Sequence, residues 1–161
     1  MRLQLQSGSS FRTILSRTLL AFVMSAALSI APAVADEAEV DQQIENLLGN
    51  ADLFKSTISD LQARIANEDS IAVSAFIDYP ITVTINGRRK TLRQAEDLEP
   101  LYYDIFTPEI TEVIVNQDYG SLFVNGDGVM FGNGEIWMNA ICLDEACNET
   151  EARIITIQAA E

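Results

Sequence analysis

Hydrophobic residues follow two different spacings in this sequence, and the spacing changes at Pro108. Before Pro108, outside the segment 81–92, apolar side chains recur every three or four residues, which is the pattern of an amphipathic helix. The clearest example is the run Phe54, Ile58, Leu61 and Ile65. After Pro108, apolar and polar residues alternate, which is typical of strands with one buried face. The change predicts an α+β domain in which helices come first and an antiparallel sheet follows.

The first expected elements are helical. The stretch 36–51 is acidic, and we interpret it either as a short helix or as a flexible arm. The next helix carries the Phe54 stripe, and Asn50 or Asp52 is available as its N-cap. These two segments precede any predicted strand.

A shorter helix is predicted after Ser70. It ends before Pro80, because the residue that precedes a proline avoids helical geometry. We expect its buried residues to be Ile71, Ala75 and Phe76.

A β-hairpin should follow this short helix. Residues 81–85 alternate between apolar and β-branched polar side chains, and Asn86-Gly87 can supply the positive φ angles of a tight turn. The return strand is therefore expected over 88–92. A further helix is predicted over 97–106, with Pro100 in its first turn, where proline is tolerated.

Four strands are predicted after Pro108. They are 110–115, 122–131, 135–142 and 153–157. The connections between them are short, so neighbouring strands should be antiparallel. Gly126 and Gly128 lie inside the second strand and indicate a bulge or sharp bend, which a strongly curved sheet needs.

Residues 1–35 are interpreted as a secretory signal peptide. Three arginines precede an apolar stretch, and Ala33-Val34-Ala35 provides a small-residue cleavage site before Asp36. A membrane anchor is the alternative, but the apolar stretch 19–31 is shorter than the roughly 20 residues of a spanning helix. We therefore expect cleavage, no membrane anchor after processing, and a periplasmic or secreted location.

The charge of the expected mature chain is strongly negative. From Asp36 onward it has 24 acidic and 7 basic residues, a formal charge of −17. Such a surface repels phosphate backbones, so nucleic acid is not an expected partner. Histidine is absent from the whole chain, which excludes catalytic and metal sites that depend on histidine.

Cys142 and Cys147 are the two cysteines of the chain. In an oxidising exported compartment we expect a disulfide between them. A four-residue loop between two strands would place the two positions opposite each other, at a separation that a disulfide can span. A redox-active pair is the alternative, but the spacing is not C-x-x-C and the acidic neighbours suppress the thiolate.

Three segments carry a resemblance to a known family. They are FIDYP at 76–80, YDIF at 103–106 and GVMFGNGEIW at 128–137. Together with the order of elements, they resemble exported bacterial proteins of the NTF2-like superfamily that have no assigned activity. The resemblance covers about 52–159 and implies one domain over 52–161, a cone-shaped α+β fold whose strongly curved antiparallel sheet wraps a long helix and leaves a cavity. The superfamily includes isomerases, dehydratases, hydrolases and binding domains, so the fold does not imply one function.

An acid–base enzyme is one functional hypothesis that this resemblance raises. The candidates are carboxylates near aromatic residues: Asp78 with Tyr79, Asp104 with Tyr103, and Glu135 with Trp137. Each also has a purely structural explanation, because such pairs arise by chance in an acidic chain and a strand tryptophan is commonly core. We therefore assign no catalytic residue and expect no cofactor. An isomerase or hydrolase acting on a small apolar substrate through a carboxylate and a tyrosine stays as the alternative.

A metal site is not expected. The segment 125–128 resembles the middle of an EF-hand loop, which requires oxygen ligands at its first and twelfth positions. Those positions would be Phe123 and Gly134, and neither side chain offers an oxygen.

Four of the seven mature cations gather near the predicted hairpin. They are Arg88, Arg89, Lys90 and Arg93. They could recognise an anion or an acidic partner, or they could be solvated side chains that protect a strand edge. The second interpretation is the simpler one.

The predicted contact surface lies on strand 135–142. One face carries Glu135, Trp137 and Asn139, and the opposite face carries Ile136, Met138 and Ala140. The chain's one tryptophan, between an acid and an amide, favours the first face for contact with a ligand or partner. Three tyrosines could complete an aromatic lining: Tyr79, Tyr102 and Tyr103. A core position for Trp137 is the alternative, and which face lines a cavity stays open.

The sequence thus favours an exported, non-catalytic binding or assembly domain. The expected partner is a small apolar or amphipathic ligand or another protein, and a homodimer is one form that assembly could take.

Overall fold

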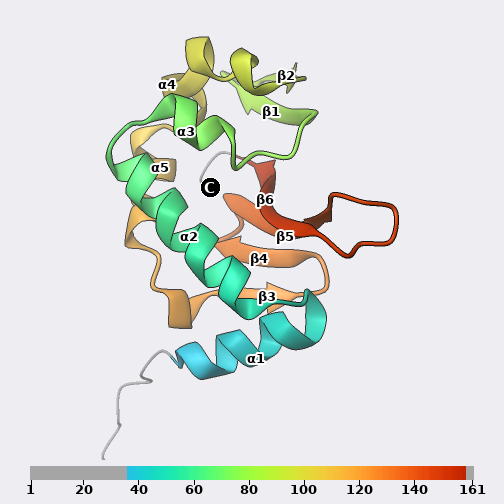
Figure 1. Cartoon of the computed structure of the whole chain (residues 1–161). Helices are drawn as coiled ribbons and strands as arrows, with labels where there is room; N and C mark the ends of the chain where they lie inside the picture. Colours follow the sequence, from blue (N-terminus) through green and yellow to red (C-terminus); the bar gives the residue numbers. More distant parts are fainter. Residues whose placement is uncertain (1–35, 159–161) are drawn as a thin grey trace, which may run out of the picture. The chain divides into compact units, whose positions relative to one another are not determined.

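Residues 36–158 are described by the computed structural model of the chain (Figure 1). The predicted signal peptide, residues 1–35, lies outside the described residues, as do residues 159–161. The described part confirms the expected α+β class, because helices pack beside a four-stranded antiparallel sheet and a two-stranded sheet. Within residues 36–158, no helix is both long and apolar enough to cross a membrane.

The first two helices form where their caps and apolar stripes predict them. α1 spans Glu37–Leu47, which confirms the helical alternative for the acidic segment. α2 spans Ala51–Ala66 and buries the four residues of the Phe54 stripe. The Asn50 side chain accepts a hydrogen bond from the Leu53 N–H at 3.1 Å, so it caps the first turn of α2.

α3 spans Ser70–Ser74, and its buried face differs from the predicted one. Val73 is fully buried, whereas Ile71 is 73% exposed and Ala75 is exposed. The reason is the length of the helix. Five residues form little more than one turn, so the stripe from Ile71 to Ala75 has no second turn with which to share a buried face. Phe76, beyond the end of α3, is partly buried.

The two-stranded sheet confirms the predicted hairpin. β1 (Ile81–Ile85) pairs with β2 (Arg88–Leu92) in antiparallel register, with Ile85 opposite Arg88. The turn residues Asn86 and Gly87 have φ angles of 49° and 74°, as a tight turn between twisted strands requires.

The helix predicted over 97–106 is wrong as a single element. The structure has two 3₁₀ turns, Ala95–Asp97 and Glu99–Leu101, followed by the one-turn helix α4 (Tyr102–Ile105). Pro100 lies in the second 3₁₀ turn, where its missing N–H and its ring prevent a continuous α-helix through this segment. The apolar side chains are nevertheless buried as a helical spacing would bury them: Leu98, Tyr102, Ile105 and Phe106.

The strand predicted over 110–115 is also wrong, because this segment is the helix α5 (Pro108–Asn116). Ile110 and Ile114, four residues apart, are its buried residues. Packing against α2 decides the outcome. The Gln62 side chain of α2 donates to the carbonyl oxygens of Ile114 and Gln117, at 2.9 and 2.8 Å, and so satisfies groups that a helix end leaves without partners.

The four-stranded sheet has the order β3-β4-β5-β6, with every neighbouring pair antiparallel. Its strands are β3 (Phe123–Asn125), β4 (Gly128–Phe131), β5 (Ile136–Cys142) and β6 (Thr150–Ile157). The predicted last two strands are confirmed, with β6 beginning three residues earlier than expected. The predicted strand 122–131 is instead the β3–β4 hairpin. Its chain reverses at Gly126-Asp127, because the Asn125 side chain accepts from the Asp127 N–H at 2.8 Å and closes a turn.

The core lies between the sheet and the helices on one of its faces, where α2 runs across the strands (Figure 1). The inner face of the sheet contributes fully buried side chains from three strands: Val129, Phe131, Ile136, Met138 and Ile154. The open edge of β6 is covered by residues 76–78. Asp78 donates its N–H to the Ile154 carbonyl at 2.9 Å, and Ile154 donates to Phe76 at 2.7 Å. Among the described residues, the opposite face of the sheet carries side chains that are at least partly exposed, including Phe123, Met130 and Trp137.

Candidate functional site

A row of large side chains crosses the outer face of the four-stranded sheet. The strand register places Phe123 opposite Met130, Met130 opposite Trp137, and Trp137 opposite Thr156. Directly opposed residues of neighbouring strands share a face, so these four side chains stand side by side. We call Phe123, Met130 and Trp137 the outer row.

The outer row is apolar but only partly covered. Phe123 is 51% exposed, and Met130 and Trp137 are each partly exposed. The rings of Phe123 and Trp137 meet edge to face, with centroids 6.3 Å apart. In the described part of the chain, none of the three belongs to the buried core or packs against it. Trp137 is thus not a core residue, which was the competing expectation.

The strand residues around the outer row are mostly neutral. Asn139, the next outward residue on β5, donates its side-chain N–H to the Asp127 carbonyl at 3.1 Å and so holds the β3–β4 turn. The charged residues on this face of the strands are Glu151 and Arg153, whose side chains form an ion pair. Arg153 also donates to the Ile77 carbonyl at 3.2 Å. A chain with 24 acids therefore presents no unpaired charge from the strands of this face.

Glu135 does not lie with Trp137 and Asn139. It precedes β5, is only 4% exposed, and its carboxylate accepts a hydrogen bond from the Asn133 N–H at 2.6 Å. Strand alternation starts at Ile136, so it does not extend to Glu135. The buried carboxylate closes the turn between β4 and β5.

Tyr102 and Tyr103 lie in a different place, a groove of about 710 Å³ beside α2, α4 and α5. Tyr102 is buried and meets the exposed Tyr103 edge to face, with ring centroids 5.3 Å apart. The Tyr103 hydroxyl donates to the Glu68 carboxylate at 3.1 Å, and this bond raises the pKa of Tyr103. Burial raises the pKa of Tyr102, with a further contribution from Glu68. These tyrosines belong to the helical side, so they do not extend the outer row.

Tyr79 occupies a third place. Its hydroxyl is buried and has no hydrogen-bond partner among the described residues. This burial raises the pKa of Tyr79 to about 12, and the nearby carboxylates of Asp97 and Glu96 add to the shift. Of the six predicted contact residues, Trp137 and Asn139 share the outer face of the sheet, and Tyr102 and Tyr103 share the groove on the helical side. Glu135 and Tyr79 each lie elsewhere.

The candidate catalytic carboxylates come from separate elements. Asp78 lies beside β6, Asp104 is on α4, and Glu135 is in the β4–β5 turn. Asp104 lines a hollow of about 270 Å³ to which neither Asp78 nor Glu135 contributes. Among residues 36–158, no three carboxylate or cysteine side chains are grouped so that they could hold a metal ion.

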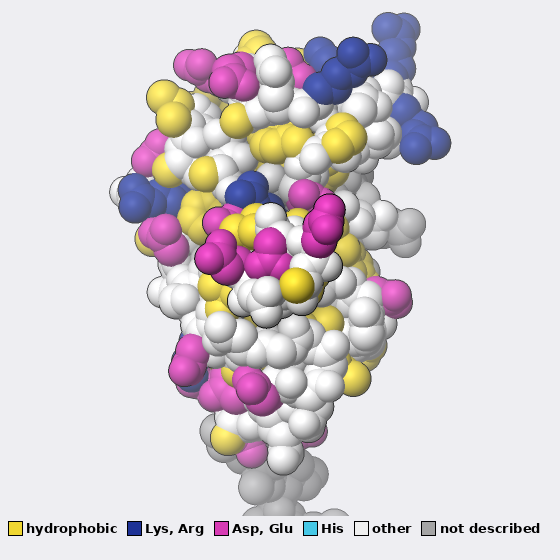
Figure 2. Space-filling view, turned by 45° about the vertical axis from the view of Figure 1, so that its right-hand side comes forward, with side chains coloured by type: hydrophobic (Ala, Val, Ile, Leu, Met, Phe, Trp, Pro, Cys, Tyr) yellow, Lys and Arg dark blue, Asp and Glu magenta, His cyan; other side chains and the backbone are white. Residues whose placement is uncertain are grey.

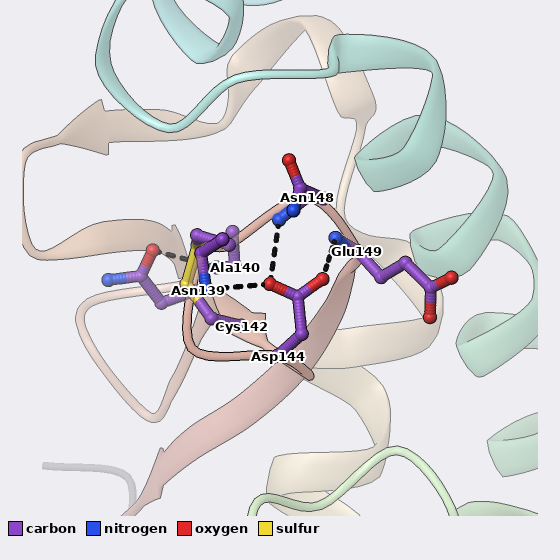
Figure 3. Close-up of a disulfide and its surroundings, with 8 residues drawn as sticks. Asn139, Ala140, Cys142, Asp144, Asn148 and Glu149 are labelled. Atoms are coloured by element: carbon purple, nitrogen blue, oxygen red, sulfur yellow. Dashed lines mark hydrogen bonds between the residues drawn. A yellow bond between two sulfur atoms is a disulfide. The ribbon is translucent and has the colours of Figure 1, made fainter.

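The disulfide between Cys142 and Cys147 is present, which confirms that expectation (Figure 3). It closes the loop between β5 and β6, and the two Cα atoms are 4.7 Å apart. Inside the loop, the Asp144 carboxylate accepts hydrogen bonds from the N–H groups of Asn148 and Glu149, both at 3.1 Å, and of Ala146 at 2.8 Å. These bonds, that of Asn148 first, lower the pKa of Asp144.

The sequence reasoning missed Phe123, Met130 and Asp144. Phe123 and Met130 could have been found from the Asn125–Gly128 segment, because a two-residue turn at Gly126-Asp127 aligns them on opposite strands. For Asp144 the sequence signal is weaker: an aspartate in a tight loop has a short side chain that can accept hydrogen bonds from nearby backbone N–H groups.

A comparison of the chain with protein-family models, with curated proteins and with solved structures finds no match. The geometry of the described residues is therefore the basis for any functional argument.

Proposed function

We propose that this chain is a non-catalytic binding or assembly domain that associates with a second copy of itself through the outer face of its four-stranded sheet. The observation that carries the proposal is the outer row. Two aromatic rings and a methionine stand side by side on the sheet, outside the core and at least partly exposed.

The composition of this face supports a protein contact. Aromatic residues and methionine are enriched in protein interfaces, whereas acidic residues are depleted there. Two copies of a chain with a formal charge of −14 repel each other over most of their surfaces. The outer face lacks unpaired strand charges, so it is where two copies can approach without that penalty. A symmetric dimer would bring the same row of both copies together.

The packing of the inner face also favours association over a ligand cavity. α2 runs across the sheet, as it would in the NTF2-like cone that we propose for the fold (Figure 1). The facing side chains Phe54, Phe131 and Met138 are all fully buried and join one apolar cluster. Side chains of this size fill the space in which a cone of this type would hold a ligand.

The enzyme alternative has less support. Its most buried carboxylate, Glu135, is occupied by the Asn133 N–H in a turn. Export to an oxidising compartment is part of the proposal, and the Cys142–Cys147 disulfide supports it because such bonds persist where thiols are oxidised.

The test adds one negative charge to the outer row. Phe123→Glu places a carboxylate at a half-exposed position, so the fold should be retained while two facing rows would repel each other. Ile71→Glu is the matched control, because Ile71 is 73% exposed on α3 and gives the same change in charge. Sedimentation velocity should show a dimer for the wild-type chain and for Ile71→Glu, and a monomer for Phe123→Glu. A wild-type chain that stays monomeric at all concentrations would contradict the proposal, as would a Phe123→Glu chain that still dimerises.

A further inference from the structure

The cations of the described chain divide into two groups. Lys55, Arg64 and Arg153 each lie within 4 Å of a carboxylate. The other four form no ion pair with any described residue, and all lie on or next to β2: Arg88, Arg89, Lys90 and Arg93. Figure 2 shows these side chains gathered at the top right of the molecule, while acidic side chains are spread over the rest of the visible surface. In a chain with 24 acids, the unpaired positive charge is thus concentrated at one place.

Three of these cations surround a hollow with an apolar wall. The hollow has a volume of about 540 Å³ and is lined by Ile85, Asn86, Arg88, Arg89, Lys90 and Leu101. No acidic residue contributes to this lining. Arg93 is not part of it. Its backbone N–H donates to the carboxylate of Asp97, the last residue of the 3₁₀ turn that follows β2, at 2.8 Å.

The hairpin register explains how charge and apolar surface come together here. Lys90 stands opposite Val83, whose side chain is buried, and Arg88 stands opposite Ile85. Arg88 and Lys90 therefore emerge from the face of the hairpin that packs onto the domain, next to the apolar side chain of Ile85. A strand whose cations only protect an edge would direct them away from apolar surface. These two cations instead border it.

We propose that this hollow binds an amphipathic anion from solution, a molecule with one anionic head group on a short apolar chain. Arg88 and Lys90 would hold the head group with charge-assisted hydrogen bonds, while Ile85 and Leu101 contact the apolar chain. The site is separate from the outer row, and its existence does not depend on self-association.

Decanoate is the probe, and its binding to the full chain can be followed by calorimetry and by amide chemical shifts. We expect saturable binding with the largest shifts in residues 85–92 and at Leu101. Decan-1-ol, which lacks the charge, and inorganic phosphate, which lacks the chain, should each bind at least about tenfold more weakly, because each offers only half of the contacts.

Two double variants with the same change in net charge test whether Arg88 and Lys90 bind the head group. The double variant Arg88→Gln/Lys90→Gln removes two exposed charges and should weaken decanoate binding by about tenfold or more. The double variant Lys55→Gln/Arg64→Gln makes the same change in net charge on the helices and should leave the affinity unchanged. Shift mapping on the wild-type chain locates the site even if a variant loses stability.

Several outcomes would overturn this proposal. Equal binding of decan-1-ol would show that the charge has no role, and equal binding of phosphate would show that the apolar wall has none. Decanoate shifts centred on Phe123 and Trp137 would place the ligand on the outer row instead. Binding only to vesicles of anionic phospholipid, with none to monomeric decanoate, would indicate a membrane surface as the partner.

Discussion

Tyr79 carries a buried hydroxyl without a hydrogen-bond partner among the described residues. Leaving such a group unpaired costs roughly 1–3 kcal/mol, so Tyr79→Phe should leave the free energy of unfolding unchanged or raise it. Tyr119→Phe is the control, because the Tyr119 hydroxyl donates to the Asp41 carboxylate at 2.7 Å. Losing that bond should lower the free energy of unfolding by about 1–2 kcal/mol. Urea unfolding of both variants measures the difference, and a Tyr79→Phe chain as destabilised as Tyr119→Phe would refute this account of Tyr79.

Asp144 makes the cysteine loop sensitive to acid. Its pKa is lowered by hydrogen bonds from the backbone, so the ionised form stabilises the loop. That contribution is complete above the unfolded pKa of about 3.9 and is lost as the pH falls through the lower folded value. The protection of the Asn148 and Glu149 amide protons, relative to the exchange rate of an unfolded chain at the same pH, should therefore fall below about pH 4, while the core strands stay protected. In Asp144→Asn, which cannot titrate, this pH dependence should disappear; if it persists, another group controls the loop.

For single residues, the alternation of side chains predicts the correct face of the sheet only within the strand itself. It places Trp137 and Asn139 correctly on the face opposite Ile136 and Met138. It fails at Glu135, because the strand begins one residue later and the turn uses the carboxylate as an acceptor. No spacing rule indicates where a strand begins to within one residue.

Gly128 opens β4 with a φ angle of 139°, a conformation that residues with a Cβ rarely adopt. A Cβ at this position would also collide with the backbone carbonyl of Met138 on the neighbouring strand. Gly128→Ala should therefore lower the free energy of unfolding by roughly 2–4 kcal/mol. Gly126→Ala, in the adjacent turn, is the matched control, because no atom lies within 4 Å of its added Cβ. Thermal unfolding compares the two, and equal stabilities would contradict the register between β4 and β5.

The strand predicted over 110–115 is a helix because two local signals disagree there and a distant contact decides between them. The segment 108–116 contains five β-branched residues, which favour a strand: Ile110, Thr111, Val113, Ile114 and Val115. The four-residue spacing of its buried residues, Ile110 and Ile114, instead favours a helix. The contact with α2 selects the helix, and Gln62 is too far away in the sequence for local patterns to include it. The β1–β2 hairpin was predictable because Asn86-Gly87 determines its own geometry.

For the whole molecule, the α+β class followed from the order of spacings, but the outer row did not. The outer row depends on the register of three strands. The alternating pattern of 122–131 predicts one strand, whereas this segment is the hairpin of β3 and β4. The separation of paired and unpaired charges is also a property of the whole molecule. The unpaired cations gather at the β1–β2 hairpin. On the outer face of the four-stranded sheet, the charged strand residues are Glu151 and Arg153, and they pair with each other. The two surfaces are therefore suited to different partners.

Trp137 is the chain's one tryptophan and belongs to the outer row, so its fluorescence tests self-association through this face most directly. As the protein concentration rises, its emission should move to shorter wavelength and its quenching by acrylamide should weaken, in step with the dimer seen by sedimentation. Phe123→Glu should keep the emission of the dilute chain at every concentration. An emission that does not change while the chain dimerises would show that the copies meet through another surface, and would contradict the account.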